Sequence, residues 1–177
     1  MRYVALLRGV NLGSRRRVAM GELRELLAAA GYEEVRTLLQ SGNVAVTTPK
    51  PADAVRAELE LAIAERFGVD TIVILRTRAE LAAVIEANPL ADVATDPKRL
   101  QVIFLSGKPA AEAVRDLEAA DVTPERIAVR GREIHVWHAN GIQRSPAAKL
   151  LELADLGVDA TARNWSTVAK LLALADG

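Results

Sequence analysis

The chain contains no cysteine, which excludes disulfide bonds, thiolate metal sites and a cysteine nucleophile. Aromatic residues make up only 3% of its 177 residues. Basic and acidic residues balance at 23 each, whereas a protein that coats a polyanion is usually strongly basic. No apolar run approaches the ~20 residues of a membrane span, and charge interrupts the amino terminus too early for a signal peptide. These absences predict a cytoplasmic protein with no membrane segment.

Half of the residues are hydrophobic, so a chain of this length can form a core without cross-links. The charge is unevenly distributed along the sequence. Residues 1–50 hold eight basic and four acidic side chains, and the remaining segments compensate with acid. Any surface that attracts anions is therefore expected in the amino-terminal part.

The first half of the chain shows the pattern of strands and helices typical of a ferredoxin-like unit. Apolar residues at helical spacing and short β-branched runs alternate in the order β-α-β-β-α-β. Thr77 and Glu80 have the spacing of a capping box, which predicts a further helix. The expected elements are a strand at 2–7, a helix at 20–30, a hairpin of 35–39 and 44–48, a helix at 51–67 and a strand at 71–75.

The second half repeats this order after a segment with two prolines, residues 89–98, which we interpret as a linker. Ser145 and Pro146 have the types expected at the N-cap and first position of a helix. The sequence therefore predicts an α+β protein of two duplicated ferredoxin-like (βαββαβ) lobes, with helices packed on antiparallel sheets. The expected lobes are 1–88 and 99–177, the second with an extra carboxyl-terminal helix. The elements expected there are strands at 100–105, 127–129, 134–137 and 158–162, and helices from 109, 145 and 165.

Two polar, glycine-bearing loops are expected to meet at one end of the first sheet. In the ferredoxin-like order, strands one and three are antiparallel neighbours ~4.8 Å apart, so the loop after the first faces the hairpin turn before the third. Arg8 is the candidate charged clamp, and glycines let backbone N–H groups approach an anion closely. The alternative is that these residues only shape the turns. The candidate ligand-binding residues of this rim are Arg8, Gly9, Asn11, Gly13, Ser41, Gly42 and Asn43.

Arg163 and Asn164 are added to the candidate ligand-binding residues with a similar ambiguity. Asn164 is suited to cap the last helix, Trp165 to pack it, and Arg163 to reach a ligand or an acidic partner. The run Arg15–Arg17 has the charge to contact phosphates, although a solvated loop explains it equally well. Because paired aromatics that stack bases are missing from the strands, nucleic acid is only weakly supported as a partner.

Enzyme signatures are mostly missing, and no catalytic residue is assigned. His135 and His138 stand three apart on an expected strand, so alternation sends them to opposite faces and they form no metal site. The segment Gly9–Gly13 lacks the spacing and the Lys-Ser/Thr pair of a P-loop. We therefore expect no metal and no cofactor.

Four sequence blocks stand in order along nearly the whole chain. They are Leu6-Leu7-Arg8-Gly9-Val10-Asn11-Leu12-Gly13, Leu39-Gln40-Ser41-Gly42-Asn43-Val44, Asn88-Pro89-Leu90 and Thr161-Ala162-Arg163-Asn164-Trp165-Ser166-Thr167-Val168. With these blocks the chain resembles the domain of unknown function 1697 family. The segment Ser145–Leu150 is also similar to a serine-and-lysine block of that family, with a longer spacing. The resemblance implies a bacterial-type cytosolic protein with a duplicated ferredoxin-like architecture, and it implies no activity.

The leading functional hypothesis is a protein that binds a small anionic ligand, phosphate- or nucleotide-like, at the loop rim of the first lobe. The alternative is a transferase or hydrolase that acts on a phosphorylated small molecule in an interlobe cleft, with Arg8 and Arg163 holding the developing charge. A third hypothesis is a protein-interaction module without a ligand site. The sequence leaves the choice between enzyme and binding protein open, as it does the oligomeric state.

Overall fold

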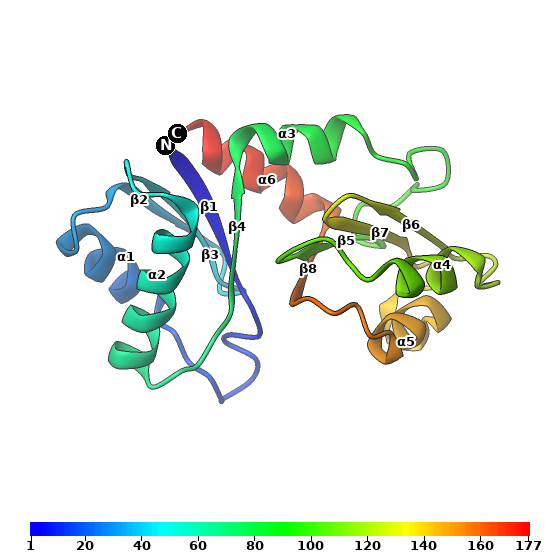
Figure 1. The fold of residues 1–177 in the computed structure, drawn as a ribbon, viewed down its shortest axis with the longest axis horizontal. Helices are drawn as coiled ribbons and strands as arrows, with labels where there is room; N and C mark the ends of the chain where they lie inside the picture. Colours follow the sequence, from blue (N-terminus) through cyan, green and yellow to red (C-terminus); the bar gives the residue numbers. More distant parts are fainter. The chain divides into compact units, whose positions relative to one another are not determined.

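The computed structural model describes residues 1–177, which form two compact units. The first unit comprises residues 1–82 and 170–177, and the second comprises residues 83–169. Each unit holds one four-stranded antiparallel sheet with helices packed on it (Figure 1). The predicted α+β class with two similar ferredoxin-like units is confirmed.

The first sheet has the strand order β2-β3-β1-β4, which is the ferredoxin-like order predicted from the sequence. Strand β1 lies between β3 and β4 and is antiparallel to both. The elements of the first unit are β1 (Arg2–Leu7), α1 (Met20–Ala29), β2 (Glu33–Leu38), β3 (Asn43–Thr47), α2 (Ala52–Phe67) and β4 (Val73–Thr77), followed by α3 (Arg78–Glu86).

The core of the first unit lies between its sheet and helices α1 and α2. Alternate residues of β1, namely Tyr3, Ala5 and Leu7, point toward the helices because successive side chains of a strand face opposite sides. Leu27 of α1 and Leu59 of α2 are fully buried against them. Each buried leucine stabilises the fold by roughly 1.5–3 kcal/mol, so the helical spacing of these residues fixes which helix face meets the sheet.

The residues at the end of α2 and at the start of α3 explain these two helix limits. Gly68 ends α2 in a left-handed conformation with φ of 64°, and its N–H donates to the Ala64 carbonyl. Thr77 and Glu80 form the capping box of α3: the Thr77 backbone N–H donates to Glu80 Oε2 at 2.7 Å, and the Glu80 backbone N–H donates to Thr77 Oγ1 at 3.3 Å.

The second sheet has the order β6-β7-β5-β8, which repeats the arrangement of the first. Its core lies between the sheet and helices α4 and α5, where Leu117 and Ala147 pack against Ile134 and Val136. The elements are β5 (Leu100–Leu105), α4 (Ala111–Ala119), β6 (Arg126–Arg130), β7 (Glu133–Trp137), the 3-10 turn η1 (Ile142–Arg144), α5 (Pro146–Leu153), β8 (Ala160–Asn164) and α6 (Trp165–Asp176).

The unit boundaries differ from the expected division at 88 and 99. The expected linker, residues 89–98, has no helix or strand, yet Leu90 is only 1% exposed and packs with Leu100 and Trp137 in the second unit. The segment therefore belongs to the second unit because it contributes to that unit's core. The boundaries between the two units fall inside helices: one lies in α3, between residues 82 and 83, and the other in α6, between residues 169 and 170.

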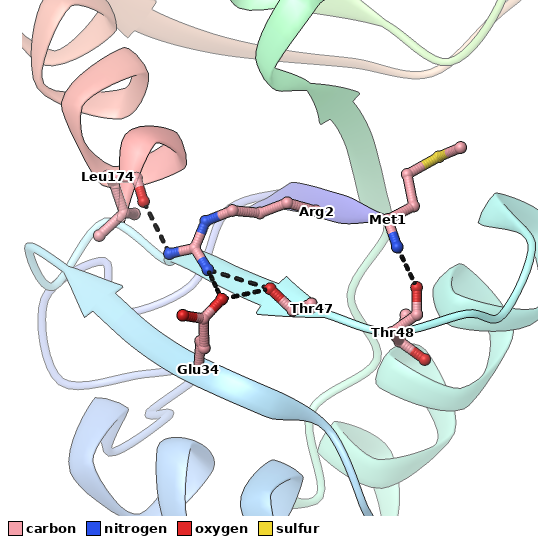
Figure 2. Close-up of polar contacts among 6 residues, drawn as sticks. All are labelled: Met1, Arg2, Glu34, Thr47, Thr48 and Leu174. Carbon is pink, nitrogen blue, oxygen red and sulfur yellow. Dashed lines mark hydrogen bonds and ion pairs between the residues drawn. The ribbon is translucent and has the colours of Figure 1, made fainter.

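The last residues of α6 belong to the first unit because the edge of that unit holds them (Figure 2). Arg2 donates from Nη2 to the Leu174 carbonyl at 3.0 Å, and from Nη1 to Glu34 at 2.9 Å and to Thr47 at 3.0 Å. Arg78 forms an ion pair with Asp176. The carboxyl terminus is thereby joined to β1, β2, β3 and α3.

Strands β4 and β8 both end two residues later than expected. The apolar runs predicted strands at 71–75 and 158–162, whereas the strands span 73–77 and 160–164. Each extension carries an arginine, Arg76 at 1% and Arg163 at 7% exposure. The prediction failed because an arginine after an apolar run normally indicates the end of a buried strand.

Candidate functional site

The structure brings together the two loops that were expected to meet. The Leu7 backbone N–H donates to the Gly42 carbonyl at 2.8 Å, where β1 gives way to the first loop. Four residues further along, Asn11 Nδ2 donates to the Gln40 carbonyl at 2.8 Å. The loop after β1 and the hairpin turn between β2 and β3 therefore form one rim at one end of the sheet.

Position 42 of this rim needs a glycine for two reasons: neighbouring atoms leave no room for a side chain, and the backbone has a positive φ. Its φ is 86°, and a Cβ at this position would lie 2.6 Å from Val10 Cγ2 and 2.8 Å from Leu7 Cβ. Both contacts are shorter than carbon atoms tolerate, and a left-handed backbone disfavours a side chain. The hairpin turn approaches the first loop this closely only because residue 42 lacks a side chain.

Asn11 holds the shape of the first loop. Its Nδ2 donates to the Val18 carbonyl at 2.9 Å in addition to Gln40, and its Oδ1 accepts from the Val18 backbone N–H at 2.8 Å. Both amide hydrogens are therefore donated to backbone carbonyls. The residue has a φ of 55°, a conformation that asparagine adopts more readily than most residues.

Asn43 is buried and organises the hairpin turn. Its side-chain amide donates to the Leu38 carbonyl at 2.8 Å and to Ser41 Oγ at 3.1 Å, and the residue is 0% exposed. Ser41 itself is exposed.

Gly13 has a φ of 62°, and a Cβ built on it would have no heavy atom within 4 Å. This glycine is therefore needed for the backbone conformation of the turn, and not because another segment packs closely against it.

A cavity of about 360 Å³ opens beside the first loop. The backbone N–H of Arg8 donates to the Ile72 carbonyl at 3.0 Å, and the Arg8 carbonyl accepts from Thr71 Oγ1 at 2.9 Å, so the start of this loop is held to the segment before β4. Of the predicted site residues, only Arg8 and Gly9 line the cavity. Its lining residues are Arg8, Gly9, Leu12, Arg16, Asp70 and Ile72.

Arg16 is the cavity residue that the sequence placed only in a basic cluster. Its guanidinium donates from Nε to the Gly9 carbonyl at 2.7 Å and from Nη2 to the Asp70 carbonyl at 2.6 Å. Both acceptors are neutral carbonyl oxygens, so these bonds fix the group without neutralising its charge. In the sequence, the run of three arginines with no acid between them indicated a basic loop. It did not indicate which of the three side chains would bond to the backbone of that loop.

Arg163 and Asn164 belong to the second unit, whereas the other predicted site residues belong to the first. Arg163 donates to Thr161 Oγ1 at 2.9 Å and to the Ala162 carbonyl at 2.8 Å, and burial lowers its pKa to about 10, so it stays charged at neutral pH. Asn164 Oδ1 accepts from the Thr167 backbone N–H at 2.9 Å. The expected capping of the last helix by Asn164 is confirmed.

A buried polar cluster in the second unit, formed by Gln101, Glu125, His138 and Ser145, was not anticipated as a group. Ser145 Oγ donates to Glu125 Oε2 at 2.8 Å and lies 2.7 Å from His138 Nδ1, while His138 Nε2 lies 3.1 Å from Gln101 Oε1. Ser145, Glu125 and His138 are each at most 5% exposed. The predicted N-cap role of Ser145 was the only sequence signal for this cluster.

A serine beside a histidine and a carboxylate also occurs in nucleophilic catalysis, but the hydroxyl of Ser145 has a structural role here. Ser145 Oγ accepts from the Ala148 backbone N–H at 2.9 Å, and Glu125 Oε2 accepts from the Ala147 N–H at 2.8 Å. The proton of Ser145 Oγ is donated to the Glu125 carboxylate. Burial lowers the pKa of His138, and the neighbouring Glu125 carboxylate partly offsets this. The cluster fastens the start of α5.

The element order and the two sheet topologies define a duplicated ferredoxin-like α+β protein. The chain is similar in structure to the conserved bacterial protein SP0830 from Streptococcus pneumoniae, with a TM-score of 0.81 and 23% identity over 98% of each chain. A search of curated proteins found no match. A family model described as "Protein of unknown function (DUF1697)" matches residues 1–135, and the chain belongs to this family.

No helix of the chain combines the length and the apolar character that a membrane span requires.

Proposed function

We propose that the first unit binds a small phosphate-bearing molecule in the cavity beside the first loop. The observation that carries this proposal is that two arginines, Arg8 and Arg16, line one cavity together with the backbone of Gly9. Guanidinium groups bind phosphate oxygens through paired, charge-assisted hydrogen bonds. Gly9 has a φ of 61° and no side chain, so a ligand can approach its backbone closely.

The remaining lining residues favour a particular kind of ligand. The volume of about 360 Å³ falls within the ordinary range for small-molecule sites. Asp70, on the same cavity, accepts hydrogen bonds and repels a second negative group, which favours a phosphate ester that also carries a hydroxyl or amino group. Leu12 and Ile72 offer apolar surface to the rest of the molecule. A nucleoside monophosphate or a sugar phosphate has these features.

In this proposal the other residues of the rim act through the loop. Asn11 and Gly42 join the two turns, while Asn43 and Ser41 shape the hairpin turn, and this fixes the backbone that carries Arg8 and Arg16. Arg16 spans the cavity wall from Gly9 to Asp70 through two backbone carbonyls. The cavity is therefore preorganised by its own chain, which lowers the entropic cost of binding.

An NMR titration with three ligand classes tests this proposal. Inorganic phosphate, a nucleoside monophosphate and a short RNA are each added up to millimolar concentration while the backbone amides are followed. The proposal predicts saturable shifts at residues 8–13 and 70–72 with the monophosphate, and weaker ones with phosphate. Shifts spread over the exposed arginines with RNA alone, or silence with all three, would overturn it.

A further inference from the structure

A second cavity, of about 390 Å³, lies between α4 and α5 of the second unit. Three carboxylates line it, those of Glu112, Asp116 and Asp155, together with Leu150 and Leu153. None of its lining residues is basic. We call this surface the acidic groove. It differs from the cavity of the first unit in the sign of its predominant charge.

The two cavities share one property, an exposed leucine. Leu153, in the acidic groove, is 77% exposed, which makes it the most exposed large hydrophobic side chain of the chain. Leu12, in the cavity of the first unit, is 67% exposed, and of the other large hydrophobic side chains only that of the terminal Met1 is more exposed. Contiguous exposed apolar surface rimmed by polar residues is typical of docking sites, and in the acidic groove Leu150 and Leu153 lie together beside the carboxylates. The rims here carry opposite charges.

Residues 12–17, which we call the arginine loop, carry the charge that the acidic groove lacks. Arg15 and Arg17 are exposed and form no ion pair within the chain. The loop contains no acidic residue. Leu12, Arg15 and Arg17 of the loop are complementary to a groove whose leucines are flanked by three carboxylates.

We infer that the chain associates with a second copy of itself, with the arginine loop of one copy docked in the acidic groove of the next. Leu12 then packs on Leu153, while Arg15 and Arg17 face Asp116 and Glu112. A second copy is favoured over an unrelated basic protein because both complementary surfaces are present on the same chain, whose formal charge of zero is divided between a basic amino-terminal part and an acidic remainder.

The contact joins two different surfaces, so it is heterologous and adds copies head to tail. Its ion pairs are exposed and screened by salt, and they contribute little each, so the association is weak and depends on ionic strength. The two proposals share Leu12, which lines the cavity of the first unit and also packs on Leu153 in the docked pair. They use different charged side chains, because docking uses Arg15 and Arg17 whereas the ligand is held by Arg8 and Arg16. Charge variants at residues 15, 17 and 116 leave Arg8 and Arg16 in place, so failure of one proposal can be told from failure of the other.

Sedimentation velocity over a range of protein concentrations tests the inference. The wild-type chain is expected to gain mass with concentration in low salt and to revert to a monomer at about 0.5 M salt. The groove variant Asp116→Arg and the loop variant Arg15→Glu/Arg17→Glu are each expected to stay monomeric. Circular dichroism of each variant confirms that it is folded.

Mixing the two variants gives the sharper result. The groove variant keeps a normal arginine loop and the loop variant keeps a normal groove, so an equimolar mixture is expected to form a pair that neither forms alone. Matched controls reverse exposed charges outside both surfaces, Arg24→Glu on α1 and Glu152→Arg on α5, and both are expected to associate like the wild type.

Three outcomes would overturn the inference. These are a wild-type chain that stays monomeric at every concentration, an association that survives both charge reversals, and a monomeric chain whose groove binds an arginine-rich peptide. The last outcome assigns the groove to a different partner.

Discussion

Asn11 donates a hydrogen bond from its side chain to the backbone carbonyl of Gln40 at 2.8 Å. The two residues lie 29 positions apart, and the bond joins the loop after β1 to the turn between β2 and β3. The same side chain also bonds twice to Val18, so one residue closes its own loop and fastens it to the neighbouring turn.

The variant Asn11→Ala is expected to destabilise the first unit. It removes three hydrogen bonds and leaves partly buried backbone groups without partners, which costs about 2–3 kcal/mol in the free energy of unfolding. Urea denaturation measures this loss. Gln40→Ala is the matched control, since Gln40 takes part through its backbone, and its effect should stay within about 0.5 kcal/mol. Equal losses in the two variants would contradict the assignment.

A second prediction concerns the close approach at Gly42. Gly42→Ala places a Cβ within 3 Å of Val10 and Leu7 at a positive φ, so we expect a loss of about 3 kcal/mol or more. Gly13→Ala has a similar φ but open space around it, and only the conformational cost of about 1 kcal/mol applies. Thermal unfolding of both variants separates the steric from the conformational contribution. A smaller loss in Gly42→Ala than in Gly13→Ala would refute the packing argument.

The buried cluster of the second unit gives a third prediction. Ser145→Ala removes the cap of α5 and takes a partner from both Glu125 and His138, which are buried. We expect a loss of about 2–4 kcal/mol, because a buried charged group is left less satisfied. Ser166→Ala, which removes an exposed serine hydroxyl bonded to Asn164, should cost less than about 1 kcal/mol. Denaturant midpoints of the two variants provide the comparison, and similar midpoints would count against a structural role for the cluster.

The element order, the sheet order and the meeting of the two loops could all be predicted, because periodicity, turn residues and helix caps are local signals. The capping box at Thr77 and Glu80 and the cap at Ser145 are examples, since each depends on residues three positions apart. The convergence of Arg8 and Gly42 on one rim followed from the strand order alone.

Other features could not be predicted because they depend on tertiary contacts. Glu125, Ser145 and His138 meet only after β7 and α5 pack, and nothing in their spacing indicates this. Arg76 and Arg163 are buried strand residues, contrary to the usual preference of arginine for the surface. The turn of Arg16 back to the carbonyls of Gly9 and Asp70 depends on the loop conformation.

The buried histidines predict a dependence of stability on acid. Burial, with a smaller contribution from Arg130, lowers the pKa of His135 from 6.5 to about 4, so the folded state keeps this side chain neutral. As pH falls from 6.5 toward 4, the unfolded state binds a proton that the folded state does not, and stability is lost by up to about 3 kcal/mol. Burial lowers the pKa of His138 in the same direction.

The contribution of His135 is isolated by comparing the wild type with His135→Leu in urea unfolding at several pH values. Carboxylates contribute equally to both proteins, so the difference between the two curves reports the histidine. The variant should lose less stability than the wild type between pH 6.5 and 4. Parallel curves would show that His135 does not titrate as its burial implies.

The affinity for a nucleoside monophosphate, measured by calorimetry, tests the central claim most directly. Loss of a charged hydrogen bond costs about 1.5–3 kcal/mol, so Arg8→Gln should weaken binding by roughly 10- to 100-fold. Arg24→Gln removes an exposed arginine outside the cavity and should leave the affinity unchanged. Equal affinities in the two variants, or no heat of binding to the wild type, would contradict an anion site formed by Arg8 and Arg16.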